Sequence, residues 1–131
     1  MSINNIEKEV IKMVIEMNNK TDGFYNYMGK IFGSRIVQRQ INDRIYDDNE
    51  KNWYLYIEDE RVVACVSTLN NVIKNVYTIK ETYLEEILKK IRKENKIKES
   101  IVPNVYENIY QKVGFKINKE DSMKNFILIY D

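Results

Sequence analysis

The strongest constraint on the fold is a run of three strand-like segments between residues 53 and 78. The segments "WYLYIED" and "ERVVACVSTL" are rich in β-branched and aromatic residues, and the tight acidic turn Glu58-Asp59-Glu60 joins them. The segment "NNVIKNVYT" follows directly as a third strand. Because such short connections join antiparallel neighbours, the centre of the chain is predicted to be an antiparallel meander.

A long amphipathic helix is predicted directly after the third strand. Thr78 and Glu81 have the Thr-x-x-Glu spacing of a capping box, so we expect their side chains to satisfy the first free N–H groups of this helix. The helix continues as "ETYLEEILKKIRKENK", whose apolar stripe consists of Tyr83, Ile87, Leu88 and Ile91.

The segments on either side complete a mixed pattern of helices and strands. Before the strands, apolar residues at helical spacing predict a helix over residues 3–17, and a second helix is expected to about Phe32. A break at Gly33–Ser34 then leads to a second short helix or an extended segment. After the long helix come a strand "IKESIV", a helix "VYENIYQKV" that ends at Gly114, and a closing hairpin of "FKIN" and "NFILIY". This order predicts an α+β fold with a mixed, mainly antiparallel sheet and helices on both faces.

The residue types that are missing exclude several kinds of chemistry. The chain has 131 residues, no histidine and one cysteine, Cys65. Without histidine there is no imidazole for a catalytic triad, a general base or the usual zinc site, and we predict no metal. No glycine stands between Gly33 and Gly114, so neither a Walker loop nor a dinucleotide-binding fingerprint is present there.

Charge and hydropathy limit the compartments and the binding partners that are compatible with this sequence. Lysine plus arginine number 21 and aspartate plus glutamate number 20, a balance that points to no polyanionic partner. The lone cysteine excludes an internal disulfide, and no apolar run is long enough for a signal peptide or a membrane span. We therefore expect a cytoplasmic protein with no membrane partner.

Two motifs in this order of elements resemble the GNAT superfamily of N-acetyltransferases. "NIYQKVGFK", Asn108 to Lys116, is similar to the family's helix after the fifth strand, which has an Ile/Leu-Tyr pair followed by Gly-Phe. "NVYTIKETYLEEIL" resembles the fourth strand and the helix that receives acetyl-CoA, and "NWYLYIEDERVVACVS" resembles the central hairpin. The resemblance implies one GNAT-like domain, 1–131, with N-terminal helices on the acceptor side at 1–49 and the sheet and cofactor side at 50–131.

The resemblance implies direct transfer of an acetyl group from acetyl-CoA to an amine of a small molecule or protein. In the family the fourth strand splays from the fifth, and its free backbone groups bind the pantetheine arm. The matching residues here are Val76, Tyr77 and Thr78. The motif tyrosine, Tyr110, would be the general acid that protonates the departing thiolate. From its helix alone, Tyr110 is better explained as a core residue with its hydroxyl at the rim.

The chain departs from the family at the loop that binds the CoA pyrophosphate. GNAT enzymes usually have Gln/Arg-x-x-Gly-x-Gly/Ala there, whereas this chain has "TIKETYLEE", without glycine. In one interpretation the start of the helix still binds phosphate through its backbone amides and the charge of Lys80. The cofactor-binding residues implied there are Lys80, Thr82, Tyr83 and Leu84. In the other, the capping box closes the site, Glu81 repels phosphate, and the fold serves another purpose.

Neither the general base nor the acceptor site stands out in the sequence. Glu58 and Glu60 are candidates for the base, although a solvated hairpin turn explains them better. Asn71 and Asn75 could align a substrate from the third predicted strand, or only mark its exposed face. An aromatic cluster could line an acceptor pocket or pack against the sheet as core, and its members are Phe24, Tyr25, Tyr27 and Phe32.

The alternative function is that of a catalytically degenerate GNAT-fold protein that binds a macromolecule. The basic segment "KKIRKENKIK", Lys89 to Lys98, gives a nucleic acid partner some support. A solvated helix face explains it better, because Glu85 and Glu86 precede two of the lysines at ion-pair spacing and no aromatic platform accompanies the charge. We therefore expect an amine-bearing acceptor as partner, no nucleic acid, and a monomer or homodimer.

Overall fold

The computed structural model describes residues 12–41, 45, 47, 50–120 and 123–131. Four strands form one antiparallel sheet in the order β1-β2-β3-β4. The strands are β1 (Lys12–Met17), β2 (Asn52–Glu58), β3 (Arg61–Leu69) and β4 (Val72–Thr78). The meander predicted from the sequence is confirmed.

Both turns of the meander consist of two residues in the left-handed backbone region. Asp59 and Glu60 have φ of 53° and 64°, and Asn70 and Asn71 have φ of 51° and 64°. Such mirror-image turns suit the right-handed twist of paired strands, and after glycine it is asparagine and aspartate that tolerate them best. The short polar turns therefore fix the register of β2, β3 and β4.

The helix predicted over residues 3–17 is wrong in its described part. Lys12–Met17 forms β1, which pairs with β2 from Lys12 opposite Glu58 to Met17 opposite Trp53. Residues 3–11 of that prediction lie outside the described residues. Pairing along the whole free edge of β2 outweighs the helical spacing of a few apolar residues, because local propensity is weak compared with tertiary contacts.

A second, three-stranded antiparallel sheet has the order β5-β7-β6. Its strands are β5 (Ser100–Pro103), β6 (Lys116–Asn118) and β7 (Phe126–Tyr130). The 3-10 turn η1 (Asn104–Tyr106) and helix α5 (Glu107–Val113) connect β5 to β6. Gly114 ends α5 with φ of 111°, as predicted, and its N–H bonds back to the carbonyl of Tyr110.

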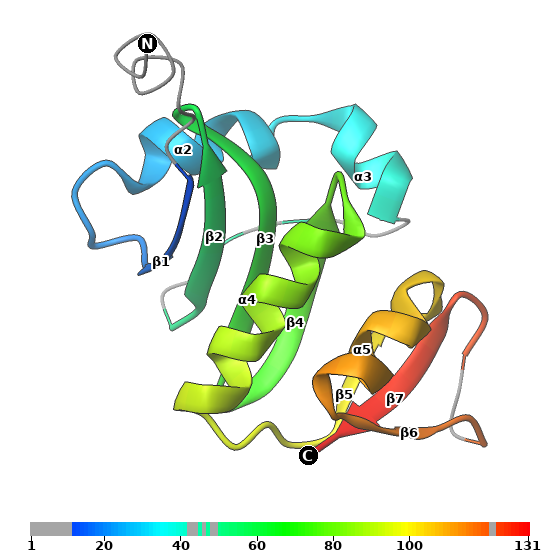
Figure 1. Ribbon diagram of the computed structural model, residues 1–131. Coiled ribbons are helices and arrows are strands. Elements are labelled where there is room, and N and C mark those ends of the chain that lie inside the picture. The colour runs from blue at the N-terminus through cyan, green and yellow to red at the C-terminus, as the bar shows by residue number, and fades with distance from the viewer. Residues whose placement is uncertain (1–11, 42–44, 46, 48–49, 121–122) are drawn as a thin grey trace, which may run out of the picture.

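The helices cover both faces of the four-stranded sheet (Figure 1). Helices α2 (Phe24–Phe32) and α3 (Arg35–Ile41) pack on the face that includes Trp53, and helix α4 (Glu81–Glu94) packs on the face that includes Tyr54. Alternate residues of β2 thus enter different cores, as the period of a strand requires. The α+β architecture with helices on both faces is confirmed.

Strands β4 and β5 touch where they begin and then belong to separate sheets (Figure 1). The N–H of Lys98 donates to the carbonyl of Asn71 at 2.7 Å, and the N–H of Ile73 donates to the hydroxyl of Ser100 at 2.9 Å. Beyond Ile73 no ladder joins the two strands within the described residues. The end of β4 therefore presents a free edge toward β5 and η1.

Candidate active site

The free edge of β4 contains the three residues that the sequence assigned to the pantetheine arm. Val76 is buried in the core beneath α4, Tyr77 is buried on the opposite face, and Thr78 is half-buried at the end of the strand. On one side these residues pair with β3, and on the other no strand of the described residues pairs with them. Their outward backbone groups are therefore available to an extended ligand, since an unpaired strand edge accepts another chain.

Tyr110 lies on α5 with its side chain fully enclosed. It has 0% of its surface exposed, and its hydroxyl has no hydrogen-bond partner in the described structure. Burial raises the pKa of Tyr110 well above its ordinary value of 10.0, and the nearby Tyr106 raises it further. The residue is thus both a core residue and a protonated, unpartnered donor at neutral pH. An orphaned donor of this kind costs free energy, which is common at functional sites.

Tyr106, which the sequence did not single out, connects Tyr110 to the end of β4. It stands four residues before Tyr110, at the start of α5, and it packs against the same core. Its pKa is raised by burial first, and then by its nearness to Tyr77 and Glu81. Tyr106 is therefore near Tyr110 on its own side of the sheet and also near Tyr77, whose side chain belongs to the other side. Only the spacing of Tyr106 and Tyr110 on one helix face hinted at this in the sequence.

The capping box predicted at the start of α4 does not form. The helix begins at Glu81 with the extended residue Lys80 as N-cap, and no side chain caps it. The Thr78 hydroxyl instead accepts a hydrogen bond from the N–H of Lys80 at 3.2 Å and donates to the carbonyl of the same residue. Thr78 therefore closes a local turn before the helix. The first N–H groups of α4 keep no side-chain acceptor, which is the condition for binding an anion there.

The residues predicted to hold the pyrophosphate divide into two kinds. Lys80 and Thr82 are exposed, whereas Tyr83 and Leu84 have buried side chains and can offer only their backbone. The N–H of Tyr83 already donates to the carbonyl of Lys80 at 3.2 Å, so the free amides of the first turn are those of Glu81 and Thr82. The Lys80 ammonium lies 5.8 Å from the Tyr83 ring centre. The lysine charge is therefore held beside the first turn of α4.

The two carboxylates considered as general bases have different surroundings. Glu58 accepts a 2.6 Å hydrogen bond from the hydroxyl of Tyr83, which ties the end of β2 to α4. Glu60 is an exposed residue of the β2–β3 turn. Neither residue lies on β4 or α5, and a structural role explains both.

The two asparagines flagged at β4 also differ. Asn71 is exposed in the turn before the strand. Asn75 is 4% exposed, and its side-chain oxygen accepts hydrogen bonds from Lys51 at 3.0 Å and from Ser67 at 2.7 Å. Sequence reasoning missed this buried polar cluster, because its members come from distant positions and meet only through the strand register.

Most of the aromatic cluster in α2 is core. Phe24 is 1% exposed and packs with Phe32 and Trp53, with ring centres 6.0 and 6.5 Å away. Tyr25 is exposed, and its hydroxyl donates to Asp47 at 3.3 Å. Packing against the sheet therefore accounts for the phenylalanines.

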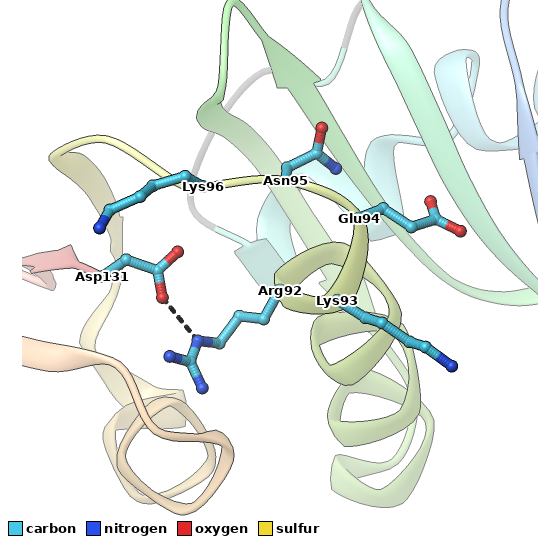
Figure 2. A pocket seen from close by; sticks show the side chains of 6 residues that line it. All are labelled: Arg92, Lys93, Glu94, Asn95, Lys96 and Asp131. Carbon is cyan, nitrogen blue, oxygen red and sulfur yellow. Dashed lines mark hydrogen bonds and ion pairs between the residues drawn. The ribbon is translucent and has the colours of Figure 1, made fainter.

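The basic segment after residue 88 is partly neutralised. Lys89 pairs with Glu85 at 3.2 Å, and Lys90 pairs with Glu94 at 3.0 Å, as expected for a solvated helix face. Figure 2 shows an open hollow of about 460 Å³ at the C-terminal end of α4, where the Arg92–Asp131 ion pair lies. This hollow is a helix length from the free amides of α4, or about 20 Å for 14 residues. No group of metal-ligating side chains is found among the described residues, and none of their helices could cross a membrane.

Solved structures of acetyltransferases share the fold of this chain. A Staphylococcus aureus N-acetyltransferase has a TM-score of 0.55 and 13% identity, covering 92% of this chain and 94% of that chain. A Bacillus subtilis acetyltransferase in complex with CoA has a TM-score of 0.51 and 15% identity, covering 92% and 97%. A Campylobacter jejuni N-acetyltransferase in complex with acetyl coenzyme A has a TM-score of 0.51 and 15% identity, covering 92% and 98%.

The chain has the GNAT fold. No protein-family model matches the sequence, and no curated protein sequence is significantly similar to it. The GNAT resemblance of the motifs "NVYTIKETYLEEIL" and "NIYQKVGFK" is confirmed at the level of the fold. Within the GNAT fold, the separated ends of β4 and β5 and the uncapped start of α4 are the features on which a function can be argued.

Proposed function

We propose that the protein transfers the acetyl group of acetyl-CoA directly to an amine. The observation that supports this best is the Tyr110 hydroxyl, an enclosed donor without a partner in the described structure. A core tyrosine without function normally finds a partner for its hydroxyl. The donor site would extend from Tyr110 along the free edge of β4 to the uncapped start of α4.

The residues at this site fit the parts of the donor. The outward backbone groups of Val76, Tyr77 and Thr78 would pair with the pantetheine arm, and one N–H would polarise the thioester carbonyl. The free amides of α4 and the Lys80 charge would hold the pyrophosphate. In the transfer the amine nitrogen bonds to the acetyl carbon and the carbon–sulfur bond breaks. The sulfur then takes the Tyr110 proton, the amine proton passes to water, and water returns a proton to Tyr110.

The alternative of a degenerate binding module loses its main support. That interpretation depended on a capping box that occupies the amides of α4, and the structure has no side-chain cap there. Glu81 remains in the first turn as a local repulsion for phosphate, so we expect modest affinity rather than none. A cytoplasmic location also remains part of the proposal, because the single cysteine is free and buried.

Thermal unfolding with and without millimolar acetyl-CoA tests the proposal. A ligand at about 100 times its Kd stabilises the folded state by about 2.7 kcal/mol, which raises Tm by several degrees in a domain of this size. ATP at the same concentration controls for phosphate alone. If acetyl-CoA and ATP both leave Tm unchanged, the donor site is absent and the proposed function is wrong.

A further inference from the structure

The polar cluster around Asn75 lies in a sheet face that is otherwise apolar. Lys51, Ser67 and Asn75 are 3%, 0% and 4% exposed, and they lie directly before β2, on β3 and on β4. Their neighbours on this face include Trp53 and Cys65, which pack beneath α2 and α3. Burying an ammonium and an amide here costs free energy that an apolar trio would not cost. Hydrophobic packing alone therefore does not explain why these three polar side chains are buried here.

A bulge in β4 turns Asn75 to this face. Ser67 stands opposite Asn75 and Thr68 stands opposite Ile73, so Lys74 is an extra residue in β4. In a regular strand, positions 73 and 75 would point to the same face, since side chains alternate along a strand. In the structure Ile73 enters the core under α4, whereas Asn75 points to the α2–α3 face with Tyr77. Bulges that redirect a side chain are frequent beside active sites.

The orientation of the Asn75 amide follows from its partners. A lysine ammonium can only donate, so the Asn75 oxygen must face the Lys51 nitrogen 3.0 Å away. The NH2 group consequently points the other way, and it donates to none of the described residues. Among those residues the only fully enclosed side-chain nitrogen or oxygen without a partner is the Tyr110 hydroxyl, so the Asn75 NH2 keeps some access to solvent.

The proposed function places the acceptor on the same side of β4 as this amide. Tyr110 and α4 belong to the opposite face, which the donor would occupy. The amine must then approach from the α2–α3 face, past Tyr77. Asn75 stands two residues before Tyr77 on that face, about 7 Å away along the strand.

We propose that Asn75 selects the acceptor, by donating its NH2 to a carboxylate or carbonyl oxygen beside the amine that is acetylated. The inference rests on the proposed function and names its substrate class: amino acids or their amides and peptides. Lys51 polarises the Asn75 oxygen and thereby strengthens the NH2 as a donor. The Ser67 hydroxyl donates to the same oxygen at 2.7 Å, so the amide cannot rotate without losing two hydrogen bonds.

A set of matched acceptors tests the substrate class with the unmodified protein. Each set contains an L-amino acid, its carboxamide, and the plain amine that remains when the carboxyl group is replaced by hydrogen. Release of the CoA thiol from acetyl-CoA measures the transfer. The oxygen-bearing members should exceed the plain amine by about tenfold or more in kcat/KM, the effect of one hydrogen bond to a charged or strong acceptor. Comparing kcat/KM for the carboxamide with kcat/KM for the carboxylate distinguishes a peptide-like acceptor from a free amino acid. Equal rates for all three members would overturn the proposal.

Two asparagine variants test the residue. Asn75→Asp keeps the shape but replaces the NH2 donor by an oxygen, so the preference for the carboxylate over the plain amine should disappear through KM. Asn71→Asp makes the same chemical change at the exposed turn residue and should keep the preference. Survival of the preference in folded Asn75→Asp would show that another group binds the oxygen.

A binding measurement keeps the inference separate from the proposed function. The side-chain NH2 signals of Asn75, identified by their loss in Asn75→Asp, are followed in nitrogen-15 NMR spectra of the unmodified protein. They should shift with the amino acid and its carboxamide and stay in place with the plain amine. No shift with any of the three would overturn the role of Asn75, whether or not acetyl-CoA binds. If the NH2 signals shift but acetyl-CoA gives no stabilisation, the proposed function is wrong and Asn75 binds the amino acid without acetylation.

Discussion

The guanidinium of Arg92 lies directly over the backbone of Gly114. A Cβ at Gly114 would stand 2.5 Å from Nη1 of Arg92, and this nitrogen donates to the carbonyl of Val113 at 2.8 Å. The Nε of Arg92 pairs with the carboxylate of Asp131 at 2.6 Å. Arg92 thus fastens the end of α4 to the turn that ends α5, the helix on which Tyr110 lies.

Gly114→Ala should lower the free energy of unfolding by about 1–3 kcal/mol. The backbone has φ of 111° at this position, where a side chain is strained, and the Arg92 contact must also move. Gly29→Ala is the matched control, because a Cβ at Gly29 meets no atom within 4 Å in the middle of α2. Alanine there should leave stability unchanged or raise it by up to about 1 kcal/mol. Urea unfolding measures the free energy of unfolding of both variants. Equal changes in the two variants would contradict the strain argued for Gly114.

The sequence predicted the parts of the fold that depend on neighbouring residues. The turn at Asp59–Glu60 and the glycine at the end of α5 have local causes, and both were found as expected, whereas Asn70 and Asn71 were predicted to be strand and form a turn. β1 was mistaken for a helix because its edge pairing with β2 is not visible in its own pattern. The capping box failed because Lys80 is extended, which moves the helix start beyond the reach of the Thr78 hydroxyl.

The candidate site was only partly predictable for the same reason. Tyr110 stood out through a local motif, and its unpartnered hydroxyl adds a physical argument that the sequence could not supply. The burial of Asn75 depends on a bulge defined by the register of β4 against β3. The contact with Lys51 joins residues 24 positions apart. Such features arise only after the sheet has formed.

Tyr110→Phe should separate a catalytic hydroxyl from a structural one. As the general acid, the hydroxyl should contribute about 10²-fold or more to turnover, while acetyl-CoA affinity stays nearly unchanged. Stability should be equal or higher by up to about 1 kcal/mol, because the hydroxyl removed has no partner. Steady-state kinetics at saturating acetyl-CoA and urea unfolding give the two readouts, and an unchanged turnover would exclude the general-acid role.

Tyr54→Phe is the control for that comparison. Tyr54 is 1% exposed, but its hydroxyl donates to Glu94 at 3.3 Å and accepts from Asn95 at 2.8 Å. Removing the Tyr54 hydroxyl takes away the acceptor of the hydrogen bond that the Asn95 side chain donates. Stability should therefore fall by about 1 kcal/mol while turnover is preserved, the reverse of the pattern expected at Tyr110.

Glu85 should make stability dependent on pH at the acidic end. Hydrogen bonds from Lys112 at 2.7 Å and then from Lys89 lower the pKa of Glu85 below 4.5. A carboxylate with a lowered pKa stabilises the fold above its unfolded pKa, and this stabilisation is lost as the pH falls through the folded value. Glu85→Gln should thus be less stable than the unmodified protein at pH 7, and this difference should shrink as the pH falls below 4.5. Glu86→Gln, whose contact to Lys89 is 3.8 Å long, should show a smaller difference.

Glu81→Gln should strengthen acetyl-CoA binding about two- to fivefold. The Glu81 charge lies in the first turn of α4, where the pyrophosphate is proposed to bind. A charge near a helix end is worth about 0.3–1 kcal/mol, which converts to this range of Kd. Because Glu81 does not take part in a capping box, its neutral variant should lose only the favourable interaction with the helix dipole and unfold at slightly lower urea.

Titration calorimetry at low and high salt measures the effect at Glu81. The gain in affinity should shrink at 0.5 M salt, where the Debye length is only about 4 Å. Glu86→Gln controls for the loss of one negative charge on the same helix, more than a turn further from its start, and should leave the Kd almost unchanged. Equal gains in both variants would indicate a general charge effect. No gain at Glu81 would mean that the phosphates do not approach this helix, and the proposed position of the donor would have to be abandoned.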